Sequence, residues 1–93
     1  AKVTSVNSNT TLNSTHFIVL VDASSNNVTI TLPSASSAPG RLYIIKATAI
    51  GVLKSVTVSP TSCLIDGASS LTISVLNTAK QIVSDGSNWY VIN

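Results

Sequence analysis

The sequence predicts an all-β fold, an antiparallel β-sandwich or β-prism of about eight short strands. Val, Ile and Thr supply 31 of the 93 residues. These β-branched side chains pack well on a pleated sheet and lose rotamer freedom in a helix. The chain contains no Glu and no Met, and its alanines do not recur at helical spacing. Short apolar runs alternate with turn residues throughout, which is typical of sandwiches, barrels and prisms.

Eight runs carry strand signals, and we expect no helix. The clearest alternation places Val28, Ile30 and Leu32 on one face of a half-buried strand. The dipeptides Asp66-Gly67 and Asp85-Gly86 mark turns, because both residue types tolerate positive φ. The expected strands comprise residues 2–6, 16–22, 28–32, 41–48, 56–58, 71–75, 80–83 and 89–92.

The strand expected at residues 41–48 is apolar on both faces. We place Leu42, Ile44 and also Ala47 towards the core and Tyr43 and Ile45 on the opposite face, since successive side chains of a strand alternate.

Length and pattern indicate one domain. It covers residues 16–93, and residues 1–15 are either a shaft or linker segment or the first strand. Residues 7–15 are polar and are expected to form a loop or a sheet edge.

The composition favours a homo-oligomer. Hydrophobic residues make up 44% of the chain and charged residues 9%, and the mean hydropathy is +0.44. A stable monomer normally keeps a well-charged surface, so we expect part of this surface to contact other subunits.

The same composition argues against several other partners. The five cations lie singly along the chain and aromatic residues make up 4% of it, whereas nucleic-acid binding favours clustered basic residues with stacking aromatics. We therefore expect no nucleic-acid partner. No apolar run reaches the length of a membrane span, so we expect no membrane insertion.

Catalytic and metal-binding patterns are also missing from the sequence. Cys63 is the single cysteine and His16 the single histidine, so neither has the paired spacing that a zinc site requires. We interpret Cys63 as a small buried hydrophobe and His16 as a strand-entry residue. A general base needs a nucleophile and an orienting acid, so we expect no enzyme, no cofactor and no metal.

The C-terminal aromatic pair is the candidate ligand contact. An exposed Trp89 or Tyr90 ring could stack on the apolar face of a sugar, and Asn88 could supply hydrogen bonds. Core packing is the alternative. Consecutive strand residues point to opposite faces, so one ring must face away from the core or into a subunit interface.

Two stretches resemble the C-terminal ends of viral fibre proteins, as found in bacteriophage tail fibres and large DNA viruses. One runs from Val28 through Leu32-Pro33 and Pro39-Gly40 to Lys46; the other comprises residues 66–73 and 83–92, with the phrase Asp-Gly-Ser-Asn-Trp-Tyr. The resemblance covers most of the chain from His16 onwards, and residues 1–15 show no clear match. It implies the distal head or cap of a fibre on the virion surface, commonly a homotrimer of β-sandwiches or β-prisms. It transfers no catalytic or binding residues.

Three functions fit these observations. A receptor-binding fibre head would attach the virion to a host receptor or glycan through loops such as 34–39 or 59–63, because binding loops are often held on a rigid scaffold. A purely structural trimerisation cap would touch no host molecule, and the Ser/Thr-rich, uncharged, aromatic-poor surface favours it. A monomeric carbohydrate-binding module of a cell-surface protein would need several exposed aromatics.

Overall fold

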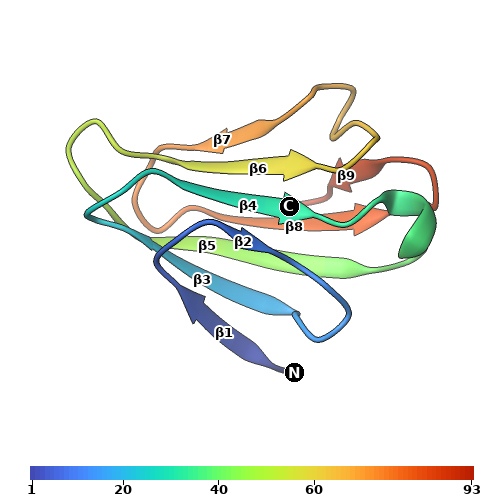
Figure 1. Cartoon of the computed structure of the whole chain (residues 1–93), viewed down its shortest axis with the longest axis horizontal. Coiled ribbons are helices and arrows are strands. Elements are labelled where there is room, and N and C mark those ends of the chain that lie inside the picture. Colours follow the sequence, from blue (N-terminus) through green and yellow to red (C-terminus); the bar gives the residue numbers. More distant parts are fainter.

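The computed structural model describes all 93 residues and contains two facing β-sheets (Figure 1). Sheet A has the strand order β1-β3-β5-β8-β9, and sheet B has the order β2-β4-β6-β7. The single helical element is one 3₁₀ turn, η1 at Ala35–Ser37. The strands are β1 Val3–Val6, β2 Thr10–Thr11, β3 Ile18–Ala23, β4 Val28–Leu32, β5 Leu42–Ile50, β6 Val56–Pro60, β7 Leu71–Ile73, β8 Ala79–Ser84 and β9 Trp89–Val91.

The all-β prediction and all eight expected strands are confirmed, although their ends shift by one or two residues. The ninth strand, β2, lies in the polar stretch 7–15 and is the edge of sheet B. It has only two residues, so no alternation could reveal it. Residues 1–15 thus contribute β1 and β2, which pair with β3 and β4.

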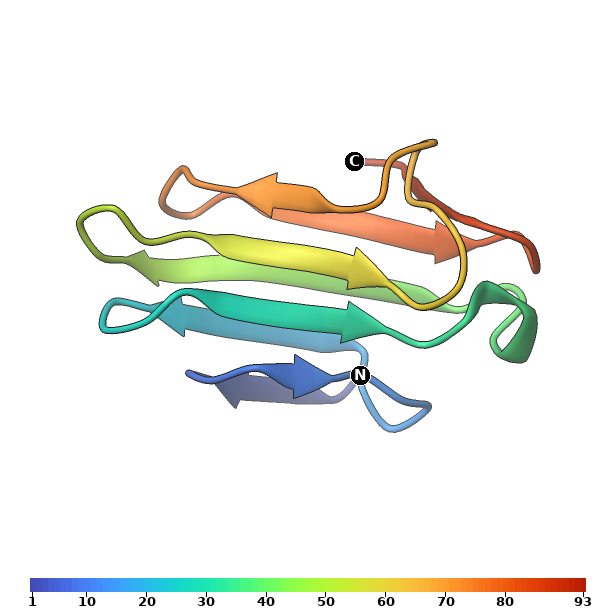
Figure 2. The ribbon, with the colours of Figure 1, turned by 45° about the horizontal axis from the view of Figure 1, so that its top comes forward.

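The wholly antiparallel arrangement that we expected is wrong in part, because both sheets are mixed. From β1 to β6 the chain crosses to the other sheet after every strand, so it winds as a flattened coil (Figure 2). Strands that are neighbours in a sheet then run in the same direction, and four pairs are parallel: β1–β3, β3–β5, β2–β4 and β4–β6. Local alternation specifies a strand but not its partner, so the sequence pattern could not distinguish the two arrangements.

The C-terminal third closes the coil with antiparallel strands. β7 pairs with β6, β8 with β5, and β9 with β8. Between β6 and β7, Asp66 and Gly67 both adopt positive φ, 49° and 77°, the backbone of a type I′ turn. The turn predicted from Asp66-Gly67 is therefore confirmed.

The core fills the space between the sheets. Eighteen buried hydrophobic residues form one cluster, to which β3, β4, β5 and β6 contribute alternate side chains. On β5 the expected facing is wrong for four residues: Tyr43 and Ile45 are fully buried, whereas Leu42 and Ile44 lie half-buried on the outer face. Ala47 is buried, as expected. A strand that is apolar on both faces alternates equally well in either orientation, so periodicity could not decide it.

The outer faces of the two sheets differ in chemistry. On sheet B, two rows of hydroxyl side chains cross the strands: Thr11, Thr31 and Ser59 in one row, and Thr29, Thr57 and Thr72 in the other. On sheet A, the outer face carries mainly apolar side chains: Val3, Ile18, Leu20, Leu42, Ile44, Val83 and Tyr90. No helix of the chain has the length and hydropathy needed to cross a bilayer.

Candidate functional site

The structure separates the two aromatic rings of the predicted contact. Trp89 is fully buried and its Nε1–H donates to the carbonyl oxygen of Pro33 at 3.0 Å. Its ring centroid lies 5.6 Å from that of Tyr43, with the planes tilted by 31°. Trp89 therefore takes the core-packing alternative, and its ring is closed to a ligand in this structure.

Tyr90 points the other way and is 40% exposed on the outer face of sheet A. It lies opposite Val83 of β8, and Val83 in turn lies opposite Leu42 of β5. Tyr90 thus belongs to the apolar outer face rather than to a separate aromatic platform.

Asn88 forms hydrogen bonds to two other segments of the backbone. Its Oδ1 accepts a hydrogen bond from the Leu64 N–H at 3.0 Å, and its carbonyl oxygen accepts one from the Asp85 N–H at 3.1 Å. Asp85 Oδ1 accepts the N–H groups of Asn88 and Ser87 at 2.9 and 2.8 Å. These backbone hydrogen bonds lower the pKa of Asp85, because they stabilise the carboxylate form. Turn formation thus accounts for both Asn88 and Asp85.

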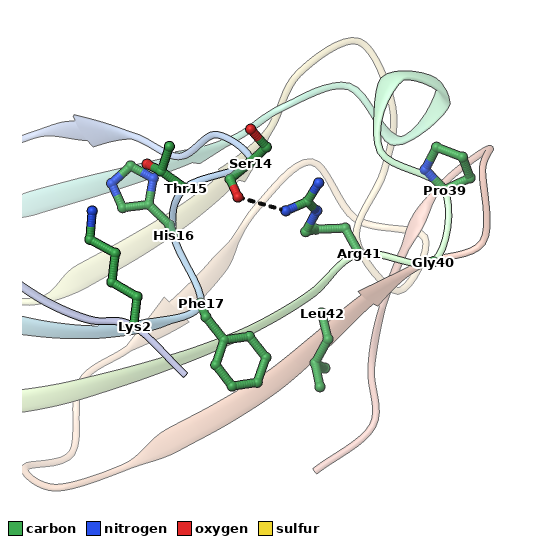
Figure 3. A pocket seen from close by; sticks show the side chains of 9 residues that line it. All are labelled: Lys2, Ser14, Thr15, His16, Phe17, Pro39, Gly40, Arg41 and Leu42. Carbon is green, nitrogen blue, oxygen red and sulfur yellow. Dashed lines mark hydrogen bonds between the residues drawn. The ribbon is translucent and has the colours of Figure 1, made fainter.

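A hollow of about 530 Å³ opens elsewhere, at the end of the sandwich where the β2–β3 and β4–β5 connections lie side by side (Figure 3). This volume lies within the range of ligand sites, about 300–1,000 Å³. Three of its lining residues are basic and none is acidic. The lining residues are Lys2, Ser14, Thr15, His16, Phe17, Pro39, Gly40, Arg41 and Leu42.

A tight turn at residues 13–16 fixes the orientation of His16. The Asn13 N–H donates to His16 Nδ1 at 3.0 Å, and the His16 N–H donates to the Asn13 carbonyl at 3.2 Å. Asn13 Oδ1 accepts from both the N–H and the hydroxyl of Thr15. Because Nδ1 acts as the acceptor, the ring proton lies on Nε2, which remains a free donor.

Arg41 is held against the same loop. Its Nη1 donates to the carbonyl oxygen of Ser14 at 3.0 Å, and this is the only hydrogen bond of the guanidinium group in the structure. Four of its five N–H donors are therefore unused.

Tyr43 lies behind Arg41 on β5 and ties the turn to the core. Its hydroxyl donates to the Asn13 carbonyl at 2.9 Å. Burial raises the pKa of Tyr43, and the positive charge of Arg41 partly opposes this shift, as expected for a phenol that loses solvation. The neutral hydroxyl thus remains a donor at neutral pH.

Sheet pairing brings Lys2 to the hollow, beside His16 and Arg41. The Ile18 N–H donates to the Lys2 carbonyl at 3.0 Å, and the Ile44 N–H donates to the Phe17 carbonyl at 2.9 Å. These bonds set the starts of β1, β3 and β5 side by side. Sequence reasoning missed this cluster, because residues 2, 16 and 41 are far apart along the chain and the parallel pairing was not expected.

The remaining candidates form no second site. Cys63 is half-buried and packs against the core. No group of three or more His, Cys, Asp and Glu side chains lies close enough to hold a metal ion.

Comparisons of the chain with protein-family models, with curated proteins and with solved structures found no match in any of the three.

Proposed function

We propose that this chain is the head domain of a viral fibre: a non-catalytic domain that assembles with further copies of itself, as a trimer, and attaches the virion to a host surface. The observation that supports this most directly is the contrast between the two outer faces. Sheet B carries hydroxyl rows suited to water, whereas sheet A carries apolar side chains on its outer face as well as in the core.

An outer face of this kind is typical of a covered sheet. Strands that are covered on both faces are apolar on both, whereas strands with one exposed face alternate between apolar and polar residues. Sheet B follows the exposed pattern and sheet A follows the covered one. We therefore assign the outer face of sheet A to the subunit interface and that of sheet B to the outside of the assembly.

The size of the face indicates how strong this assembly is. Five strands about 4.8 Å apart, with about five residues each at about 3.3 Å, span roughly 400 Å² in projection. A stable pair buries about 800 Å² per partner. The isolated head should therefore associate in a concentration-dependent manner.

A second copy fits this face better than a charged partner. The only charged side chains on the outer face of sheet A are Lys46 on β5 and Asp22 on β3. This face can therefore form few ion pairs with a highly charged partner. The threefold symmetry comes from the resemblance to fibre ends alone. A purely structural trimerisation cap would use the same face, and the uncharged hydroxyl rows of sheet B favour that alternative.

Light scattering behind a sizing column tests the assembly. We expect the mass to rise with concentration towards three times the 9.6 kDa of one chain. Leu20→Thr and Ile44→Thr together replace apolar side chains on the outer face of sheet A with hydroxyl side chains like those of sheet B. This double variant should have the mass of one chain at every concentration. Thr57→Ala, on the outer face of sheet B, is the matched control and should leave assembly unchanged. A monomer at every concentration in the parent chain would refute the assignment.

A further inference from the structure

We propose that the hollow formed by Lys2, His16 and Arg41 binds the carboxylate or sulfate group of an acidic glycan. The inference rests on the proposed function, in which the head attaches to a host surface. It replaces the stacking site expected at Trp89 with a site that recognises negative charge.

The electrostatics of the hollow select an anion. Lys2, His16 and Arg41 all line the hollow, and none of the three aspartates does. Figure 3 shows Lys2 and Arg41 flanking the segment 14–17 from opposite sides. Each cation therefore offers its charge from its own side of this segment, and hydrogen bonds in which one group is charged are about twice as strong as neutral ones.

The donors are also partly preorganised. The hydrogen bonds to Asn13 and Ser14 hold the His16 ring and the Arg41 guanidinium before any ligand arrives. Rigid groups lose less entropy on binding than mobile ones. Lys2 has no side-chain hydrogen bond in the structure and remains free to close over the anion.

The rest of the lining suits a sugar. Ser14 and Thr15 add hydroxyl groups, while Phe17, Pro39 and Leu42 add apolar surface. A pyranose ring presents both hydroxyl groups and apolar C–H faces, so it can use both kinds of contact. A nucleic acid would need a longer basic track, but the other three cations, Lys46, Lys54 and Lys80, lie outside this lining.

The hollow lies at the rim of the proposed subunit interface. Leu42 belongs both to its lining and to the apolar outer face of sheet A. In the assembled head the site would therefore remain at the edge of the buried face, where neighbouring copies could present several such sites to one polysaccharide and strengthen its binding.

Isothermal titration with three oligosaccharides tests the proposal: a heparin hexasaccharide with sulfate and carboxylate groups, a galacturonate hexamer with carboxylates alone, and neutral maltohexaose. We expect heat from one or both acidic probes and none from maltohexaose. Binding of heparin alone would assign the site to sulfate, and binding of both probes would assign it to carboxylate as well. Affinity should fall as salt rises, because exposed charges are screened.

Single charge removals locate the site. Lys2→Gln and Arg41→Gln should each weaken binding by about tenfold, since each removes a charged hydrogen bond. Lys54→Gln removes the same charge from the β5–β6 loop at the opposite end of the sandwich (Figure 2) and should change affinity less than twofold. Lys2 makes no side-chain hydrogen bond, so its variant tests the site without disturbing the fold.

Three results would overturn the proposal: no binding of either acidic probe, equal losses in all three variants, or a single-stranded DNA decamer binding as tightly with the same variant dependence. Measuring the mass of each sample distinguishes failure of the binding site from failure of the proposed assembly. A monomer that binds heparin through Lys2 and Arg41 would refute the trimer and keep the site, whereas a trimer that ignores both probes would refute the site alone.

Discussion

Replacing Trp89 distinguishes a core residue from a ligand contact. The side chain is fully buried, stacks on Tyr43 and donates its Nε1–H to the Pro33 carbonyl. Truncating a buried Trp to Ala costs about 3–5 kcal/mol, a large share of the roughly 5–15 kcal/mol by which small domains are stable. Trp89→Ala should therefore lower the melting temperature by roughly 20 °C. Trp89→Phe keeps most of the apolar volume but leaves the Pro33 carbonyl without its donor, a loss of about 1–3 kcal/mol.

Urea unfolding followed by far-ultraviolet circular dichroism measures these losses. Trp89 is the only tryptophan, so its fluorescence cannot follow its own variants. Tyr90→Ala is the matched control, an aromatic truncation on the same strand whose side chain lies on the outer face, and should cost less than about 1 kcal/mol. A Trp89→Ala variant that loses less than the Tyr90 variant, yet no longer binds a glycan, would refute the core assignment.

Three further substitutions test local features of the fold. The Thr4 hydroxyl is buried without a hydrogen-bond partner, so Thr4→Val should raise the free energy of unfolding by about 1 kcal/mol; a lower urea midpoint would contradict this. Leu53 is 95% exposed and adopts a φ of 59°, a backbone conformation that Asn tolerates better than Leu. Leu53→Asn should therefore stabilise the fold by about 0.5–1 kcal/mol. A lower melting temperature of this variant would argue against backbone strain at residue 53. The pKa of Asp85 is lower in the folded chain than in the unfolded one, so its contribution to stability is present above the unfolded value near 4 and is lost as the pH falls through the folded value. Melting temperatures measured from pH 6 to pH 2 should therefore fall more steeply for the parent chain than for Asp85→Asn, and parallel curves would show that the turn hydrogen bonds contribute nothing.

The strands and turns were predictable because their signals are local. Alternation of Val28, Ile30 and Leu32 identifies β4, and Asp66-Gly67 identifies a type I′ turn. Each signal arises from the backbone geometry of a few consecutive residues. The two residues of β2 carry no such signal, and β2 forms because β4 offers a parallel edge to pair with.

The candidate site was predictable only in part. The alternation rule correctly required that Trp89 and Tyr90 face opposite ways. It could not say which ring would be buried, and the answer depends on the Pro33 carbonyl and the Tyr43 ring, which come from distant parts of the chain. The chemistry of Lys2, His16 and Arg41 was visible in the sequence, but their proximity was not.

Residue types and their spacing thus determine the all-β class, the position of eight strands and the scarcity of charge that favours assembly. The tertiary structure alone decides the parallel pairing, the facing of β5 and the meeting of Lys2, His16 and Arg41 in one hollow. The physical reason is range: alternation and turn propensity act over a few residues, whereas pairing, facing and proximity depend on which distant segments pack together. A strand that is apolar on both faces leaves that choice to the rest of the fold, and in β5 the larger Tyr43, with a carbonyl partner for its hydroxyl, occupies the core.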